Sequence, residues 1–213
     1  MYLKGTIELE LTLGGDNLSV VKWWVDASYA CHNDMKGHTG ATMSFGRGAV
    51  TSASKNQKIN TTSTTESELV GVHDMSPQMM WTQYFLENQG YEVGTSMLYQ
   101  DNKSAILLEQ NGRDSSSKRT MHINVRYFFI KDKVESGEIT VEHCSTHDML
   151  GDYFTKPLQG KKFIEFRDRI MGVIDAIEPT PAVLRKDGSI AKCKQSAGVC
   201  WASNNQYAPL AEQ

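Results

Sequence analysis

Four acidic residues stand where a metal-dependent reaction could be carried out. Each belongs to a different predicted element: Asp26, Glu68, Asp101 and Asp152. Asp26 and Asp101 end predicted strands, and ligands collect at that edge of open α/β sheets. Carboxylate oxygens suit Mg²⁺ or Mn²⁺ better than zinc. Two such ions about 4 Å apart can hold the attacking water and the leaving oxygen of a phosphodiester.

The same four residues also have a purely structural interpretation. They are four of 25 acidic residues, and most acidic side chains lie on the solvated surface. An acid in the first turn of a helix, such as Glu68, complements the helix dipole. Spacing alone therefore favours surface acids over a site.

The elements that must position these acids begin as strands. Apolar and polar residues alternate with a period of two, most cleanly from Thr6 to Leu13, which predicts a half-buried strand there. Further strands are predicted at 20–27, 40–46 and 49–54.

A helical period follows. Thr65 and Glu68 fit a capping box that begins a helix ending near Gly90, and Pro77 should kink or split this helix. Strands and helices then alternate, which predicts an α/β fold: a mixed sheet flanked by helices. The later elements are a strand at 97–100, helices at 103–110 and 121–135, a strand at 139–143, and helices at 148–154 and 161–177.

The composition limits the possible classes of protein. The net charge is −3, with 22 Lys and Arg against 25 Asp and Glu, so this chain does not wrap nucleic acid by charge alone. No signal peptide or membrane span is evident, which favours an intracellular protein that is not associated with a membrane. No Gly-rich phosphate loop is evident either, so we expect no small-molecule cofactor. We expect one domain over 1–175 and a weakly ordered tail over 178–213.

The cysteines offer one alternative site. Zinc could be held by two adjacent Cys and His pairs, Cys31, His32, His143 and Cys144. No pair has the spacing of a zinc finger or zinc ribbon, which disfavours this site.

Six local motifs carry a resemblance to a known family. In order, they are residues 25–30 (VDASYA), 54–58 (SKNQK), 63–69 (STTESEL), 99–105 (YQDNKSA), 121–127 (MHINVRY) and 150–158 (LGDYFTKPL). This set resembles the ribonuclease H domain of copia-type LTR retrotransposon Pol polyproteins, from the first residues to about Gly172. Residues 1–6 look like the remnant of that family's junction with the preceding reverse transcriptase.

The resemblance implies a ribonuclease H-like fold, a five-stranded mixed sheet flanked by helices. It implies cleavage of the RNA strand of RNA–DNA hybrids with two Mg²⁺ or Mn²⁺ ions. One ion would be held by Asp26, Asp101 and Asp152, and the other by Asp26, Glu68 and Asp101. Glu68 matches the family's helix acid better than Glu66, because it directly precedes the apolar pair Leu69 and Val70.

Further residues near these motifs are candidates for substrate contact. The candidates for contact with the substrate, including its 2′-hydroxyls, are Ser28, Gln57, Asn102 and Lys156. Candidates for phosphate contact are Lys55, Lys58, Lys118 and Arg119, together with Lys156. His143 or His147 could assist proton transfer, as a histidine before the last acid does in related ribonucleases H.

The resemblance also sets the expected partners and the alternatives. The expected partners are an RNA–DNA hybrid and the adjoining reverse transcriptase, in the cytoplasm within virus-like particles. One alternative is an inactive or domesticated module that binds or scaffolds, although such a decayed copy should have lost at least one of the four acids. Another is an integrase or transposase of the same fold.

Overall fold

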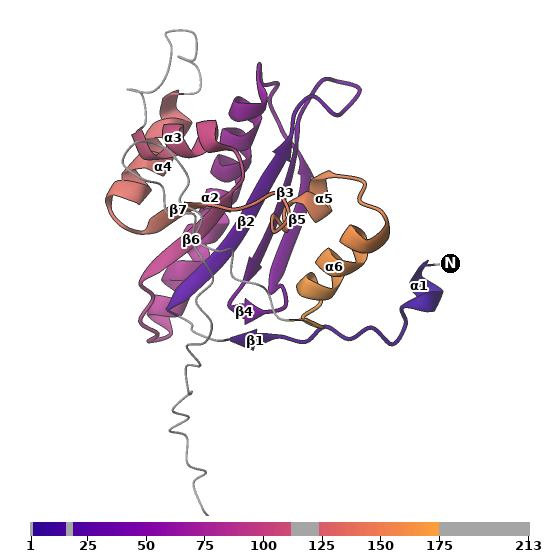
Figure 1. Ribbon diagram of the computed structural model, residues 1–213. Helices are drawn as coiled ribbons and strands as arrows, with labels where there is room; N and C mark the ends of the chain where they lie inside the picture. The colour runs from indigo at the N-terminus through magenta and orange to yellow at the C-terminus, as the bar shows by residue number, and fades with distance from the viewer. Residues whose placement is uncertain (1, 16–18, 112–123, 175–213) are drawn as a thin grey trace, which may run out of the picture. The chain divides into compact units, whose positions relative to one another are not determined.

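A five-stranded mixed sheet forms the centre of the protein. The computed structural model describes residues 2–15, 19–111 and 124–174 (Figure 1). The strand order is β5-β3-β2-β6-β7. β2 pairs antiparallel with β3 and β3 with β5, whereas β2–β6 and β6–β7 are parallel. The predicted ribonuclease H-like sheet is therefore confirmed.

From β2 onward, the helices and strands follow the predicted order with shifted ends and one added short strand, β4. Their bounds are α1 Tyr2–Gly5, β1 Gly14–Gly15, β2 Val20–Ser28, β3 His38–Ser44, β4 Gly46–Arg47, β5 Thr51–Asn56, α2 Thr64–Asn88, β6 Thr95–Gln100, α3 Lys103–Asn111, α4 Asn124–Glu135, β7 Ile139–His143, α5 Asp152–Thr155 and α6 Gly160–Ile170.

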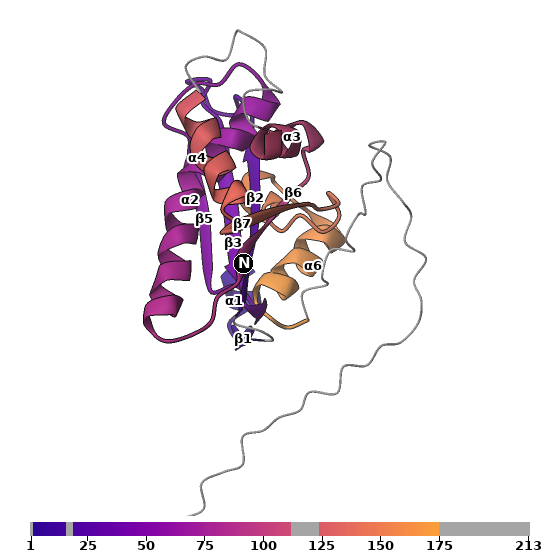
Figure 2. The same ribbon diagram turned by 90° about the vertical axis from the view of Figure 1, so that its left-hand side faces the viewer.

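Helices cover both faces of the sheet. Figure 2 shows α2 and α4 on one face and α6 on the other. Trp23 and Trp24 are neighbours on β2, so their side chains point to opposite faces. Trp23 packs in the apolar cluster beneath α2, and Trp24 packs beside Phe166 of α6. Both indoles are buried.

The predicted strand over residues 6–13 is wrong. Ile7, Leu11 and Leu13 are exposed, and the strand that follows them is the short β1, which pairs with β4. Alternation forms a stable strand only when a partner lies alongside, and the described residues provide none for most of this segment.

The start of α2 also differs from its prediction. Ser63, not Thr65, caps the helix, and its hydroxyl accepts a hydrogen bond from the Glu66 backbone N–H. The Glu66 carboxylate in turn accepts from the backbone N–H of Thr62, 2.7 Å away. The capping box therefore lies two residues earlier, which leaves Glu68 free of a capping role.

Pro77 does not split α2, which runs unbroken from Thr64 to Asn88. A proline removes the N–H that would bond the carbonyl four residues earlier, here that of His73. The Ser76 hydroxyl donates to this carbonyl at 2.8 Å and satisfies it.

Among the described residues, no helix has both the length and the hydropathy needed to cross a bilayer. The predicted tail at 178–213 lies outside the described residues, as do Lys118, Arg119 and the start of the helix predicted at 121–135.

Candidate metal centre

Asp26 lies near the end of the central strand β2, on the face covered by α5 and α6. Side chains alternate along a strand, so Asp26 shares this face with Trp24. Its carboxylate is 2% exposed and accepts a hydrogen bond from the Thr155 hydroxyl of α5. Its backbone lies opposite Gly40 of β3.

Asp152 reaches Asp26 because two glycines let α5 approach the sheet closely. A Cβ atom on Gly151 would lie 2.8 Å from the Asp26 backbone nitrogen, and one on Gly40 would lie 2.7 Å from the Gly151 carbonyl oxygen. Real Cβ atoms essentially never come so close. Glycine at both positions is therefore what allows Asp152, the first residue of α5, to lie beside β2.

Asp101 follows β6, the parallel neighbour of β2. The Thr146 hydroxyl donates to its carboxylate at 3.2 Å. The next residue, Asn102, accepts hydrogen bonds through its side chain from the backbone N–H groups of Ser104 and Ala105. Asn102 therefore caps the start of α3, and this cap fixes the turn that carries Asp101.

The three aspartates form one group. One carboxylate oxygen from each of Asp26, Asp101 and Asp152 lies within 4.8 Å of the other two. Asp26 and Asp152 are buried and Asp101 is partly exposed, so the group opens to solvent at the Asp101 side. An oxygen-only set of this kind fits a hard divalent cation such as Mg²⁺ or Mn²⁺.

Glu68 lies close to this group but outside the 4.8 Å set. It is buried, and one of its carboxylate oxygens has no hydrogen-bond partner among the described residues. Burial raises the pKa of Glu68 well above its usual range, and the negative charges of Asp26 and Asp101 raise it further. A buried, unpartnered carboxylate oxygen beside two aspartates fits a cation ligand.

Two lysines balance part of the negative charge. Lys156 Nζ lies 2.5 Å from Asp152 Oδ1 and 3.6 Å from Asp26 Oδ1, and Lys162 Nζ lies 3.3 Å from Asp152 Oδ2. Burial raises the pKa of Asp26, the Thr155 hydrogen bond and Lys156 lower it, and Asp152 and Asp101 raise it, with a net increase. Burial is thus the largest cause of the raised pKa of Asp26, and the charges of Asp152 and Asp101 add to it.

The other two predicted substrate residues differ in accessibility. Ser28 is partly exposed at the end of β2, and its hydroxyl donates to the Thr155 carbonyl at 3.3 Å. Gln57 is 1% exposed, and its amide donates to the Ser67 carbonyl and the Thr39 hydroxyl. Gln57 thus links the end of β5 to α2, and its burial does not support direct contact with a substrate.

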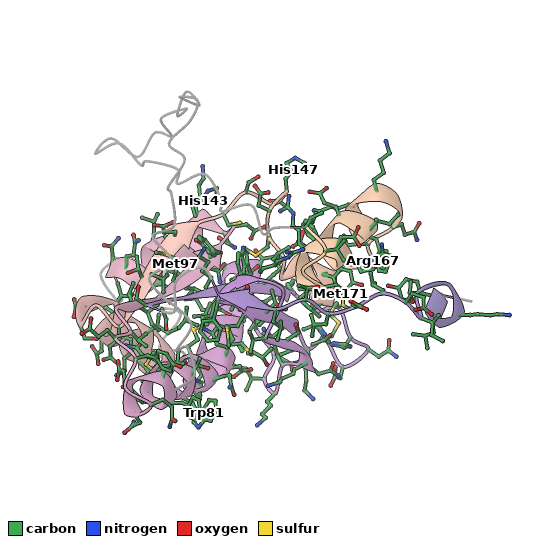
Figure 3. All side chains as sticks on the ribbon, turned by 90° about the horizontal axis from the view of Figure 1, so that it is seen from below. Trp81, Met97, His143, His147, Arg167 and Met171 are labelled. Carbon is green, nitrogen blue, oxygen red and sulfur yellow. The ribbon has the colours of Figure 1, made fainter. Side chains whose placement is uncertain are left out.

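The two candidate auxiliary histidines lie on the same border of the molecule, away from Trp81 (Figure 3). His143 ends β7 and is partly buried, and His147 is exposed in the loop before α5. Burial lowers the pKa of His143, Lys103 lowers it further, and Asp101 raises it. The lowered pKa favours the neutral form of the His143 imidazole, which is the form that can accept a proton.

The residues of the alternative zinc site are not brought together. Cys144 is buried in the cluster with Trp24, whereas Cys31 is exposed in the loop after β2. Within the described ranges, the three aspartates are the only group of three or more His, Cys, Asp or Glu side chains with metal-site spacing.

Several residues that support the site were missed in the sequence. They are Gly40, Thr146, Gly151, Thr155 and Lys162. Thr155 and Gly151 fall inside the motif around Asp152 and could have been found from it. Gly40, Thr146 and Lys162 come from other parts of the chain, and no local pattern identifies them.

Comparison with known proteins finds relatives that are retrovirus-related Pol polyproteins from plant transposons. The chain is 34% identical over 163 residues to the retrovirus-related Pol polyprotein from transposon TNT 1-94 of Nicotiana tabacum, covering 76% of this chain and 12% of the relative. It is also 34% identical to those from transposons RE2 and RE1 of Arabidopsis thaliana, covering 86% and 79% of this chain. The chain thus spans about an eighth of each relative's length, 12–13%. No family model matches.

Solved structures with a similar arrangement include LC11-RNase H1 in complex with an RNA/DNA hybrid, with 10% identity over 61% of this chain and 88% of that one, and a TM-score of 0.43. Another is the prototype foamy virus protease-reverse transcriptase, with 7% identity over 75% of this chain and 21% of that one, and a TM-score of 0.40. On the strength of the sequence relatives and the strand order, the chain belongs to the ribonuclease H-like domains of copia-type retrotransposon Pol polyproteins.

Proposed function

We propose that this domain hydrolyses the RNA strand of RNA–DNA hybrids, using two Mg²⁺ or Mn²⁺ ions during retrotransposon reverse transcription. The observation that carries this proposal is the convergence of Asp26, Asp101 and Asp152 within 4.8 Å at the edge of the sheet. Glu68, buried beside them with an unpartnered oxygen, would complete the set of metal ligands. When bound, the divalent ions supply an activated water and stabilise the leaving oxygen.

The protein's own groups hold the ligands in place before any ion binds. Lys156 compensates part of the charge of Asp26 and Asp152, while Thr155 orients the Asp26 carboxylate and Thr146 orients that of Asp101. Such neighbours fix the rotamer of a ligand and lower the cost of assembling the site. Lys156 would exchange its two carboxylates for a substrate phosphate when a cation enters, because the cation then neutralises the aspartates.

Two further side chains, Ser28 and His143, are suited to contact the substrate or to transfer a proton. Ser28 carries a partly exposed hydroxyl close to Asp26 on β2, which suits a contact to a 2′-hydroxyl of the RNA strand. His143, with its lowered pKa near Asp101, suits proton transfer at the site. The reverse transcriptase would precede this domain in the polyprotein and help hold the hybrid, since the net charge of −3 gives weak attraction for nucleic acid.

A cleavage assay with two acid variants tests the proposal. A labelled RNA–DNA hybrid is incubated with the chain and Mg²⁺ or Mn²⁺, beside Asp101→Asn and the matched control Asp74→Asn, which changes an exposed acid of α2. Asp101→Asn should lower the cleavage rate at least about 100-fold, because it removes a metal ligand. Asp74→Asn should leave the rate unchanged.

Two outcomes would overturn the enzymatic proposal. One is equal cleavage by the chain and Asp101→Asn. The other is the absence of cleavage by both, even when the preceding polymerase domain is joined to them. In that second case the domain would be a binding or scaffolding module, and its retained acids would have another role.

A further inference from the structure

Lys162 of α6 contacts the carboxylate oxygen of Asp152 that Lys156 does not contact. Its Nζ atom lies 3.3 Å from Asp152 Oδ2, whereas Lys156 Nζ lies 2.5 Å from Asp152 Oδ1. Lys156 Nζ also lies 3.6 Å from Asp26 Oδ1, so it is the Oδ1 atom of Asp152 that shares a lysine with Asp26. Asp152 is buried, so these lysines, and not water, balance its charge. The two oxygens of Asp152 thus have different surroundings.

Lys162 is held in place by groups that carry no negative charge. Its Nζ atom donates to the backbone carbonyl of Thr146 at 3.0 Å, a shorter distance than the 3.3 Å to Asp152. It also lies 4.9 Å from the ring centroid of Phe166, one turn further along α6, and an ammonium over an aromatic ring is attracted to it. Phe166 is fully buried beside Trp24, on the face of the sheet that α6 covers (Figure 2). The ammonium group of Lys162 is therefore anchored to the core.

Lys156 lacks an anchor of this kind. Its ion pairs are with Asp26 and Asp152 themselves, and its side chain is 40% exposed. Once a divalent cation neutralises these carboxylates, the attraction that holds Lys156 is lost. The carbonyl and the ring that hold Lys162 are unaffected by that change. Lys162 therefore stays beside Oδ2 of Asp152 when Lys156 leaves Oδ1.

We propose that Lys162 restricts Asp152 to binding a cation through one oxygen, and that it thereby makes the centre select Mg²⁺ or Mn²⁺ over Ca²⁺. Ca²⁺ takes roughly six to eight oxygen ligands and accepts both oxygens of one carboxylate, whereas Mg²⁺ requires a compact octahedral set. An Asp152 whose Oδ2 atom is occupied offers only Oδ1, which suits the smaller ion. This inference rests on the metal centre proposed above, and it does not require that the domain cut RNA.

Calorimetric titration of the 213-residue chain with Mg²⁺, Mn²⁺ and Ca²⁺ tests this inference. The decisive quantity is the ratio of the Ca²⁺ affinity to the Mg²⁺ affinity. Removal of a positive charge strengthens the binding of every divalent cation to a similar extent, so the effect of charge cancels in this ratio. Lys162→Gln should raise the ratio about tenfold, because it frees a second charged oxygen for Ca²⁺.

Two lysine variants serve as controls. Lys156→Gln should raise the affinities for Mg²⁺ and Ca²⁺ together and leave their ratio unchanged, because it frees the oxygen that either ion uses. Lys161→Gln changes the adjacent, exposed lysine of α6 and should alter neither affinity. An unchanged ratio in Lys162→Gln would overturn the inference, since the lysine would then act by its charge alone. An equal rise of the ratio in Lys156→Gln would also overturn it, since the two oxygens would then be equivalent.

Asp101→Asn distinguishes failure of this inference from failure of the metal centre. In the parent background it should weaken the binding of all three cations, because Asp101 belongs to the group of three aspartates. Cation binding that Asp101→Asn leaves intact would overturn the centre itself, and with it the role of Lys162. Binding that depends on Asp101, with the same ratio in the parent and in Lys162→Gln, would overturn the role of Lys162 alone.

Discussion

The two faces of the sheet differ in what they contribute. The face beneath α2 and α4 holds the larger apolar cluster, which includes Trp23, Leu98 and Ile139. The face beneath α5 and α6 holds a smaller cluster around Trp24 and Phe166, and its edge carries the three aspartates. Most of the apolar core thus lies on one face, whereas the three aspartates lie at the edge of the other, where Asp152 comes from a helix of four residues, α5. The fourth candidate ligand, Glu68, comes from α2 on the opposite face.

The largest expected effect compares the adjacent tryptophans. Trp23→Ala and Trp24→Ala should each lower the free energy of unfolding by about 3–5 kcal/mol, because both indoles are buried. Only Trp24→Ala should also weaken Mn²⁺ binding, since Trp24 lies on the face of Asp26. Urea unfolding and calorimetric titration with Mn²⁺ measure the two effects. Equal loss of Mn²⁺ affinity in both variants would contradict a division between the faces.

The second prediction concerns Glu109, a buried acid on α3. Both carboxylate oxygens lack a partner among the described residues, and burial raises the pKa of Glu109 to about 8. The folded protein therefore keeps a proton that the unfolded chain releases once the pH exceeds 4.5, the ordinary pKa of a glutamate side chain. Stability should therefore fall as the pH rises from about 4.5 to 8, by about 4 kcal/mol.

Glu109→Leu should remove this pH dependence and stabilise the protein at pH 8. The control Glu92→Gln, which changes an exposed acid, should leave the pH dependence of stability unchanged. Urea unfolding at pH 5 and pH 8 provides the measurement. A slope that persists in Glu109→Leu would assign the pH dependence to other groups.

The third prediction compares glycines on the two faces. Gly151→Ala places a Cβ 2.8 Å from the Asp26 backbone nitrogen, whereas Gly71→Ala on α2 meets its nearest atoms at 3.4 Å. Gly151→Ala should cost about 1–3 kcal/mol and weaken Mn²⁺ binding, because α5 must move away from β2. Gly71→Ala should change stability by less than about 1 kcal/mol and leave Mn²⁺ binding intact. Unchanged binding in Gly151→Ala would show that Asp152 does not need this close approach.

The smallest expected effect is at Lys156. Lys156→Gln removes a cation that competes for Asp26 and Asp152, so Mn²⁺ affinity should rise several-fold. The effect is modest because Lys156 is 40% exposed and solvent screens its charge. Lys131→Gln, which changes a lysine paired with Glu135 away from the site, is the control. A loss of Mn²⁺ affinity in Lys156→Gln would instead give the lysine a role in holding the ligands.

Prediction of the fold from the sequence succeeded where the pattern is local. The strand ending near Asp26, the helix beginning before Glu68 and the strand ending before Asp101 all appear, with ends shifted by a few residues. The pattern failed at residues 6–13, because a period of two shows that a segment can form a strand and not that a partner is present. It also misplaced the cap of α2 by two residues, since Ser63 and Thr65 are both suitable N-cap residues.

The identities of the candidate ligands were determined by the sequence itself. The motifs around Asp26, Glu68, Asp101 and Asp152 named these acids, and the preference for Glu68 over Glu66 is a prediction from the sequence. The convergence of the three aspartates was decided only by the tertiary structure. It depends on the parallel pairing of β2 with β6 and on two glycines, Gly40 and Gly151, that let α5 touch the sheet. The physical reason is that a local sequence pattern covers only a few neighbouring residues, so it cannot show that Gly40 and Gly151 are in contact. Their contact is fixed by close packing in the folded protein.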